Sequence, residues 1–98
     1  MLEKQIEAKV CDYAKKFGVG VYKFTSPARA AVPDRMFIYK GRVFFIEFKR
    51  EGQKATPAQE REHNRMRQHQ INVFVVDNVT EGEFVIATMM QMIEHKLC

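Results

Sequence analysis

The sequence predicts an α/β fold with a small mixed sheet, in the order helix, three strands, helix, strand, helix. Apolar residues recur at helical spacing near both ends of the chain, and runs of β-branched and aromatic residues lie between them. A polar helix joins two apolar strands, which is typical of a right-handed crossover between parallel strands. With 98 residues, the chain is long enough for one modest core, so we expect a single domain over 1–98.

The first helix is predicted over residues 2–17, where Gly18 ends it. Its apolar positions are Leu2, Ile6, Val10, Tyr13, Ala14 and Phe17. Glu3 and Glu7 lie one turn apart, and Glu7 falls at the border of the buried face. That carboxylate could point into a cleft, or both glutamates could be solvated at the rim of the helix.

Three strands are expected next, over 19–25, 34–40 and 43–49. The loop before the second strand holds Ser26 and Arg29, which could contact phosphate or simply be solvated. A turn at Gly41 predicts a hairpin between the second and third strands. The third strand is almost unbroken in its apolar character, so we expect it to be covered on both faces.

Three ionisable residues interrupt these apolar strands: Asp34, Glu47 and Lys49. The pleat of a strand puts Glu47 and Lys49 on the same face, because they are two residues apart. A carboxylate and an ammonium group inside an apolar strand are costly unless they are paired or functional. The alternative is an ordinary ion pair on a solvated sheet face.

The second helix, over 57–70, is predicted from a capping box in which Thr56 is the N-cap and Gln59 the N3 residue, with Pro57 at N1. It is poor in apolar residues, so we expect a surface that faces solvent, nucleic acid or a partner subunit. The histidines His63, His69 and His95 are scattered, and each is expected at the surface or in an interface.

A buried strand over 72–76 and a C-terminal helix complete the chain. A second capping box, with Thr80 as the N-cap, predicts that this helix starts there and runs to about His95. Its methionines and Phe84 are core residues in the usual case, and a methionine-rich dimer face in the less usual one.

Composition excludes several classes of protein. Hydrophobic residues make up 46% of the chain, which excludes general disorder, and the net charge of +4 weakly favours a polyanionic partner. Clustered arginines, at Arg29, Arg35, Arg42 and Arg50 and again at Arg61, Arg65 and Arg67, strengthen that interpretation. Cys11 and Cys98 do not form a zinc motif, and no signal peptide or membrane span is expected, so we predict a cytoplasmic protein.

The residues of the central strands are suited to phosphodiester hydrolysis with a divalent metal. Such a metal is held by a few hard oxygen ligands and activates water. Asp34 and Glu47 could supply these ligands, with the backbone carbonyl of Phe48 as a third and Glu7 as an outer ligand. Lys49 could stabilise the charge that develops on the phosphate. Gln59 could cap its helix or reach toward the phosphate, which a helix N-terminus also favours.

These residues resemble the PD-(D/E)xK nuclease signature. Pro33-Asp34 is followed by Glu47-Phe48-Lys49, and the fuller set is similar to the VRR-NUC branch of that superfamily. It adds Ile6-Glu7 in the first helix, Ser26-Pro27 with Arg29 before Val32-Pro33-Asp34-Arg35, and Pro57-Ala58-Gln59 at the next helix.

The resemblance implies a restriction-endonuclease-like αβββαβ core and DNA cleavage that depends on Mg²⁺ or Mn²⁺. It assigns metal binding to Glu7, Asp34 and Glu47 and catalysis to Lys49, and Gln59 matches the family's helix glutamine. We therefore expect Asp34, Glu47, Lys49 and Gln59 to be catalytic, and we expect DNA contacts from Ser26, Arg29, Arg35 and Arg50. Short stand-alone members resemble bacterial or phage proteins and Holliday junction resolvases, which implies a homodimer on branched DNA in DNA repair or recombination. The alternatives are a nuclease without branch preference, nicking or exonucleolytic, and a catalytically silent DNA-binding module.

Overall fold

The structure, a computed structural model, describes residues 1–96 and confirms the predicted α/β fold and element order. Cys98, one of the two cysteines, lies outside the described residues, and Cys11 is buried in the first helix. The elements are α1 (Glu3–Lys16), β1 (Gly20–Lys23), β2 (Arg35–Tyr39), β3 (Arg42–Phe48), α2 (Pro57–Arg67), β4 (Asn72–Val76) and α3 (Val79–Glu94).

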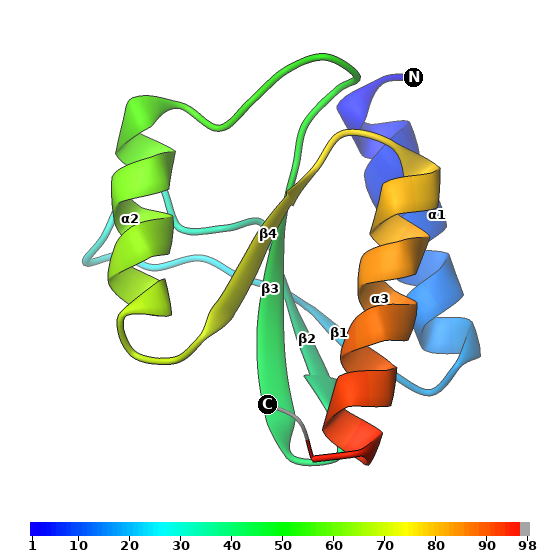
Figure 1. The fold of residues 1–98 in the computed structure, drawn as a ribbon. Helices are drawn as coiled ribbons and strands as arrows, with labels where there is room; N and C mark the ends of the chain where they lie inside the picture. Colours follow the sequence, from blue (N-terminus) through cyan, green and yellow to red (C-terminus); the bar gives the residue numbers. More distant parts are fainter. Residues whose placement is uncertain (97–98) are drawn as a thin grey trace.

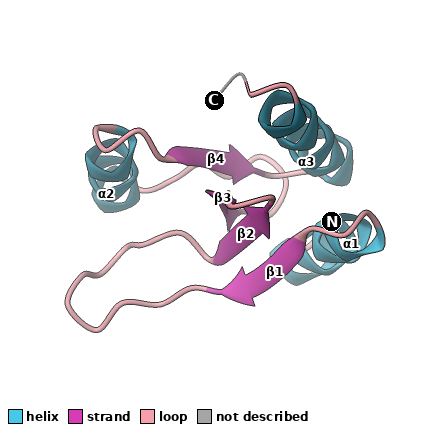
Figure 2. Cartoon of the chain, turned by 90° about the horizontal axis from the view of Figure 1, so that it is seen from below, coloured by secondary structure: helices cyan, strands magenta, loops and turns pink. Residues whose placement is uncertain are grey.

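The four strands form one mixed sheet in the order β1-β2-β3-β4, as Figure 2 shows. The first three strands pair antiparallel, and β4 pairs parallel to β3, as the crossover predicted. Lys40 and Gly41 both have positive φ, of 47° and 80°, which is the backbone of a two-residue hairpin turn. This turn fixes the register of β2 against β3, in which Arg35 lies opposite Ile46.

Helices cover both faces of the sheet, with α1 and α3 side by side on one face and α2 on the other (Figure 1). The interior strand β3 therefore buries both of its faces, as its apolar sequence predicted. Its side chains at Phe44, Ile46 and Phe48 belong to the hydrophobic core. The other core side chains under α1 and α3 include Ile6, Val10, Ala14, Phe37, Val76, Val85, Ile86, Met89 and Ile93.

Helices α1 and α3 pack closely because α3 carries a glycine at the point of contact. A Cβ atom on Gly82 would lie 2.4 Å from Cγ2 of Val10 and 3.2 Å from Cγ1 of Val76. Gly82 is buried despite its place in the first turns of the helix. The glycine is therefore required by packing against its neighbours.

Several predicted boundaries differ from the structure. The N-cap of α3 is Asn78, whose side-chain oxygen accepts the Glu81 amide at 2.8 Å, so the prediction of Thr80 as N-cap was wrong. Helix α2 ends at Arg67 rather than at residue 70, because the chain turns at Gln70, with φ 65°, to enter β4. Asp34 precedes β2 instead of lying within it.

β4 is one of the two edge strands of the sheet, and an arginine of α2 reaches its backbone. Nη2 of Arg67 donates to the carbonyl of Val73 at 2.6 Å, and Nη1 donates to Oδ1 of Asn64 at 2.9 Å. Arg67 thus has partners within the chain. Within residues 1–96, no helix has the length and apolar character needed to cross a membrane.

Candidate active site

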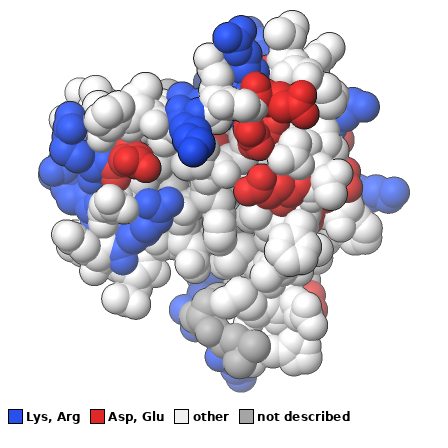
Figure 3. All heavy atoms as spheres, turned by 45° about the horizontal axis from the view of Figure 1, so that its top comes forward, with Lys and Arg blue, Asp and Glu red and all other residues white. Residues whose placement is uncertain are grey.

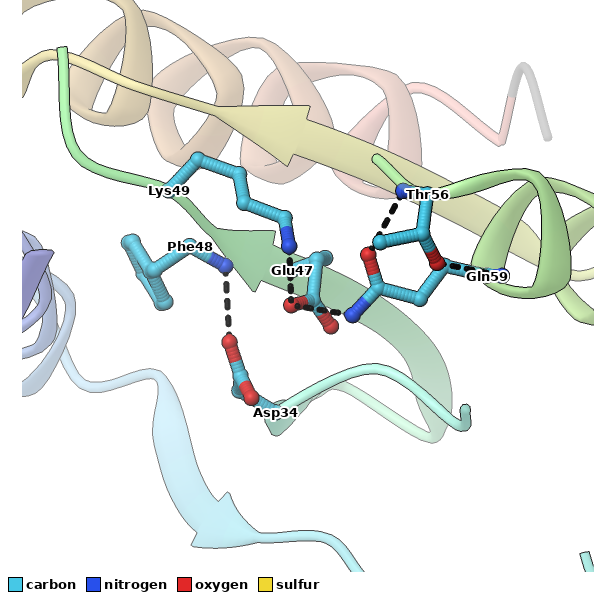
Figure 4. A network of polar contacts seen from close by, with 6 residues as sticks. All are labelled: Asp34, Glu47, Phe48, Lys49, Thr56 and Gln59. Atoms are coloured by element: carbon cyan, nitrogen blue, oxygen red, sulfur yellow. Dashed lines mark hydrogen bonds and ion pairs between the residues drawn. The ribbon is translucent and has the colours of Figure 1, made fainter. Parts of the chain in front are cut away.

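The end of β3 and the residue before β2 bring two carboxyl groups together on the face of the sheet that α2 covers. Glu47 lies near the end of β3, and the register of Arg35 with Ile46 carries Asp34 to a position beside it. Figure 4 shows both side chains pointing toward one another, with Lys49 and Gln59 on the other sides of Glu47. The structure thus brings together the four residues that the sequence predicted as catalytic.

The Glu47 carboxylate is buried, with 3% of the residue exposed. Its Oε2 accepts from Nε2 of Gln59 at 3.1 Å and lies 3.7 Å from Nζ of Lys49. Its Oε1 is also buried and has no hydrogen-bond donor among the described residues. An ionised carboxylate oxygen without a donor is costly in the interior, so this oxygen is suited to a cation or a proton.

The environment of Glu47 opposes its negative charge. Burial, first, and the nearby charge of Asp34, second, raise the pKa of Glu47 to about 7, while Lys49 acts in the opposite direction. Asp34 is itself an acceptor when ionised, so it cannot donate to Glu47. The two carboxylates can therefore both be ionised at low cost only when a positive charge compensates them.

Asp34 is held by the backbone around it. Its Oδ2 accepts the amide of Phe48 at 2.9 Å, and its own carbonyl accepts the amide of Phe24 at 3.0 Å. The first bond ties the Asp34 carboxylate to the strand that carries Glu47. As a result, the separation of the two carboxyl groups is set by backbone structure rather than by flexible side chains.

Gln59 has the capping role that the sequence predicted, and its side chain also reaches the candidate site. Its backbone amide donates to Oγ1 of Thr56 at 3.1 Å in the capping box, and its Oε1 accepts the backbone amide of Thr56 at 2.9 Å. With Oε1 occupied in this way, the Nε2 group is directed at Glu47 (Figure 4). The N-terminus of α2 therefore fixes the orientation of the Glu47 carboxylate.

Two of the predicted site residues pair with each other. Nε of Arg35 donates to Oε2 of Glu7 at 2.6 Å, in a pair that is only partly exposed, and this bond raises the pKa of Arg35. From the same helix, the charge of Glu3 contributes to the raised pKa of Glu47. The metal role of Glu7 and the DNA contact of Arg35 stay predictions.

The remaining predicted DNA contacts are spread around the site. Arg29 forms an ion pair with Glu62 of α2, at 3.5 Å from Nη1 to Oε1, and more than half of its side chain is exposed. Arg50 is exposed directly after Lys49, and Ser26 is half-buried in the loop before β2. Their DNA contacts also stay predictions.

Sequence reasoning missed two buried polar residues of α2. His63 is fully buried within the chain, so the prediction that it lies at the surface or in an interface was wrong. Burial, first, and the charge of Arg67, second, lower its pKa. It lies one turn after Gln59 on the same helix face, and this spacing was the available signal. Glu62 is buried as well. Its partner Arg65 is one turn away on the same helix, but its partner Arg29 is too distant in sequence to predict.

Comparisons with known proteins agree with this arrangement. The chain is 40% identical over 77 residues to "Putative nuclease p44" of Acyrthosiphon pisum secondary endosymbiont phage 1. The aligned region covers 78% of this chain and 83% of that protein. A solved structure described as a VRR_NUC domain superposes with a TM-score of 0.77, at 30% identity and over 95% of each chain. No family model matches the chain.

The fold and the similarity to a phage nuclease define the protein as a nuclease. It belongs to the VRR-NUC family, which confirms the resemblance drawn from the sequence.

Proposed function

We propose that this nuclease is a metal-dependent endonuclease that hydrolyses phosphodiester bonds of branched DNA. The observation that carries the proposal is the buried Oε1 of Glu47, which has no donor within residues 1–96 and lies near a second carboxylate. Hydrolysis of a phosphodiester requires an activated water and positive charge near the phosphate. The paired carboxylates are suited to hold that charge, and Lys49 adds to it.

The residues present fit a small, hard cation such as Mg²⁺ or Mn²⁺. Among residues 1–96 there is no group of three His, Cys, Asp or Glu side chains arranged to hold a metal. Asp34, Glu47 and the backbone carbonyl of Phe48 would hold it, which is sufficient for Mg²⁺ because this ion keeps several of its waters. When bound, such an ion activates water and neutralises charge on the phosphate.

The side chains around the carboxylates have separate tasks in this proposal. Gln59 engages Oε2 of Glu47 and leaves Oε1 free to bind the cation. Lys49 lies beside Glu47 with only 13% of its side chain exposed, so its ammonium group acts in a medium of low dielectric constant. There it stabilises the negative charge that develops on the phosphate oxygens.

A carboxylate from α1 completes the proposed site, and we propose Glu3 for this role instead of the expected Glu7, because Arg35 already engages Glu7. Glu3 lies on the same helix, and its charge is the smallest of the causes that raise the pKa of Glu47. We expect Glu3→Gln to lower the cleavage rate more than Glu7→Gln does. Glu7→Gln should instead lower the melting temperature, because it leaves the partly buried Arg35 without its partner. Loss of cleavage in Glu7→Gln at unchanged melting temperature would restore Glu7 as the ligand.

Selectivity for branched DNA and a homodimeric state are also proposed. One 11.5 kDa chain is small for holding a four-way junction and making symmetric cuts, which favours a pair of copies. An apolar groove of about 200 Å³ between β4 and α3, lined by Phe74, Phe84 and Met92 among others, is a candidate for the contact between them. Phe84 is 68% exposed there. With a phage relative, we propose that the protein acts in the cytoplasm of a bacterial or phage-infected cell.

The experiment incubates the purified protein with labelled four-way, flap and linear DNA, in Mg²⁺, Mn²⁺ or EDTA. Asp34→Ala and Lys49→Ala should each lower cleavage by about 10²-fold or more. Lys16→Ala, which removes an exposed lysine at the far end of α1, is the matched control. Light scattering on the same samples should give twice the mass of one chain.

Cleavage in EDTA, or full activity of both variants, would overturn the metal-dependent mechanism. Equal rates on linear and branched DNA would remove the branch selectivity and leave the nuclease. A monomeric mass would remove the homodimer.

A further inference from the structure

A basic surface lies between the loop that precedes β2 and the face of α2 that carries Arg61 and Arg65. It is a groove of about 280 Å³, which we call the arginine groove, lined by Arg29, Arg61 and Arg65 and by small side chains such as Ala30, Ala31 and Ala58. Figure 3 shows lysine and arginine side chains gathered over the α2 side of the molecule. Most of the acidic side chains in that view lie nearer the α1 side.

One buried carboxylate orients two of these arginines. Oε1 of Glu62, whose side chain is 6% exposed, accepts from Nε of Arg65 at 3.1 Å and lies 3.5 Å from Nη1 of Arg29. Both arginine side chains are about half exposed, at 54% for Arg29 and 52% for Arg65. Because a guanidinium has five N–H donors, each arginine keeps donors that are free to bind an anion from outside.

A purely structural role does not account for the whole groove. The contacts of Glu62 with Arg29 and Arg65 do fasten the loop to α2, and such a clamp is sufficient to explain those two arginines. Arg61 lines the same groove and is exposed. Three arginines against one glutamate leave the groove with net positive charge, which favours a polyanion.

The groove lies at a distance from the paired carboxylates that suits a DNA strand. Gln59, which contacts Glu47, and Arg65 are on the same helix. Six residues of α-helix span roughly 9 Å. Along one strand of DNA a phosphate occurs about every 3.4 Å of helix axis, so the groove corresponds to two or three phosphates beyond the scissile bond.

We propose that the arginine groove binds backbone phosphates of the DNA segment that flanks the scissile bond on the α2 side. This inference rests on the proposed function, and it names the surface along which the substrate lies. The alanines of the groove offer no side-chain donors or acceptors to base edges, while arginine pairs well with phosphate. The groove therefore positions DNA without reading its sequence.

The test is the salt dependence of DNA binding in EDTA, where no cleavage interferes. Fluorescence anisotropy with a labelled duplex gives the slope of log Kd against log salt concentration. Arg61→Gln should reduce the magnitude of this slope by about 0.9, the value for one phosphate contact on duplex DNA. Arg42→Gln removes the same charge from an exposed position at the opposite end of β3 and should leave the slope unchanged.

Arg61→Gln is the decisive variant because Arg61 is not a partner of Glu62, so its loss does not release the clamp. Arg65→Gln should reduce the slope by a similar amount, with its melting temperature measured in parallel. Equal slopes for Arg61→Gln and Arg42→Gln would overturn the inference. A protein that binds through the groove but never cuts DNA would instead overturn the proposed function, so the two failures are distinguishable.

Discussion

Glu47→Gln should abolish DNA cleavage and, in the absence of metal, make the protein more stable than the parent above pH 7. The amide keeps the size of the carboxyl group but removes the charge that burial and Asp34 oppose. Loss of this proposed metal ligand should lower the rate at least about a hundredfold. The raised pKa, from 4.5 to about 7, corresponds to a cost on the order of 3 kcal/mol for the ionised form in the folded protein.

The sign of the pH dependence follows from the direction of the shift. Because the folded-state pKa is raised, the cost is absent below the ordinary pKa of 4.5, and it is fully present once the pH exceeds about 7. The difference in melting temperature between Glu47→Gln and the parent should therefore be small at pH 4.5 and large at pH 8. Thermal unfolding in EDTA at several pH values measures it.

A control separates this effect from a general loss of charge. Glu60→Gln removes an exposed carboxylate from α2 and should show no comparable rise at pH 8. Adding Mg²⁺ at pH 8 should stabilise the parent but not Glu47→Gln, since a ligand stabilises only the protein that binds it. A Glu47→Gln protein that is less stable than the parent at pH 8 would contradict the account of this site.

Gly82→Ala is expected to destabilise the fold although alanine is the better helix former. The new methyl group would lie 2.4 Å from a methyl group of Val10, which is branched at Cβ and fully buried. Overpacking of this kind typically costs about 1–3 kcal/mol. The change from glycine to alanine gains roughly 1 kcal/mol in helix propensity, so a clash near the upper end of that cost range outweighs the gain. We expect a melting temperature several degrees lower, measured by circular dichroism.

The matched test is the double variant Gly82→Ala, Val10→Ala. Val10→Ala alone removes core volume and should destabilise the protein, but it also makes room for the methyl group at position 82. The two changes together should therefore cost less than the sum of the single costs. If the losses of stability in the two single variants simply add in the double variant, the contact with Val10 is not the reason why position 82 requires glycine.

Much of the fold could be predicted because local patterns determine it. Helical spacing in α1, the capping box at Thr56 and the apolar run of β3 each define one element, and the crossover rule then sets the parallel pairing of β4. The prediction of Thr80 as the N-cap of α3 was wrong because Asn78, two positions earlier, is also of a residue type that caps helices well. Only the structure shows that the Asn78 side chain accepts the Glu81 amide.

The proximity of Asp34, Glu47 and Lys49 was predictable because these residues lie at or directly beside the ends of two adjacent strands. The partners of the surrounding charges were not. Arg35 pairs with Glu7, which lies 28 positions away in the sequence, and helical or strand periodicity does not predict a contact over that separation. The sequence analysis expected solvent or DNA as the partner of Arg29 and Arg35. In the structure, each of these arginines pairs with a carboxylate of the same chain.

The contact of Arg67 with β4 has a consequence for solubility. An edge strand exposes backbone donors and acceptors to which a strand from another molecule can add, and this is a common route to aggregation. In this protein the Val73 carbonyl at the edge is already bonded to a guanidinium group from α2. The charged side chain of Arg67 therefore opposes the addition of a strand from another molecule along the apolar segment 72–76.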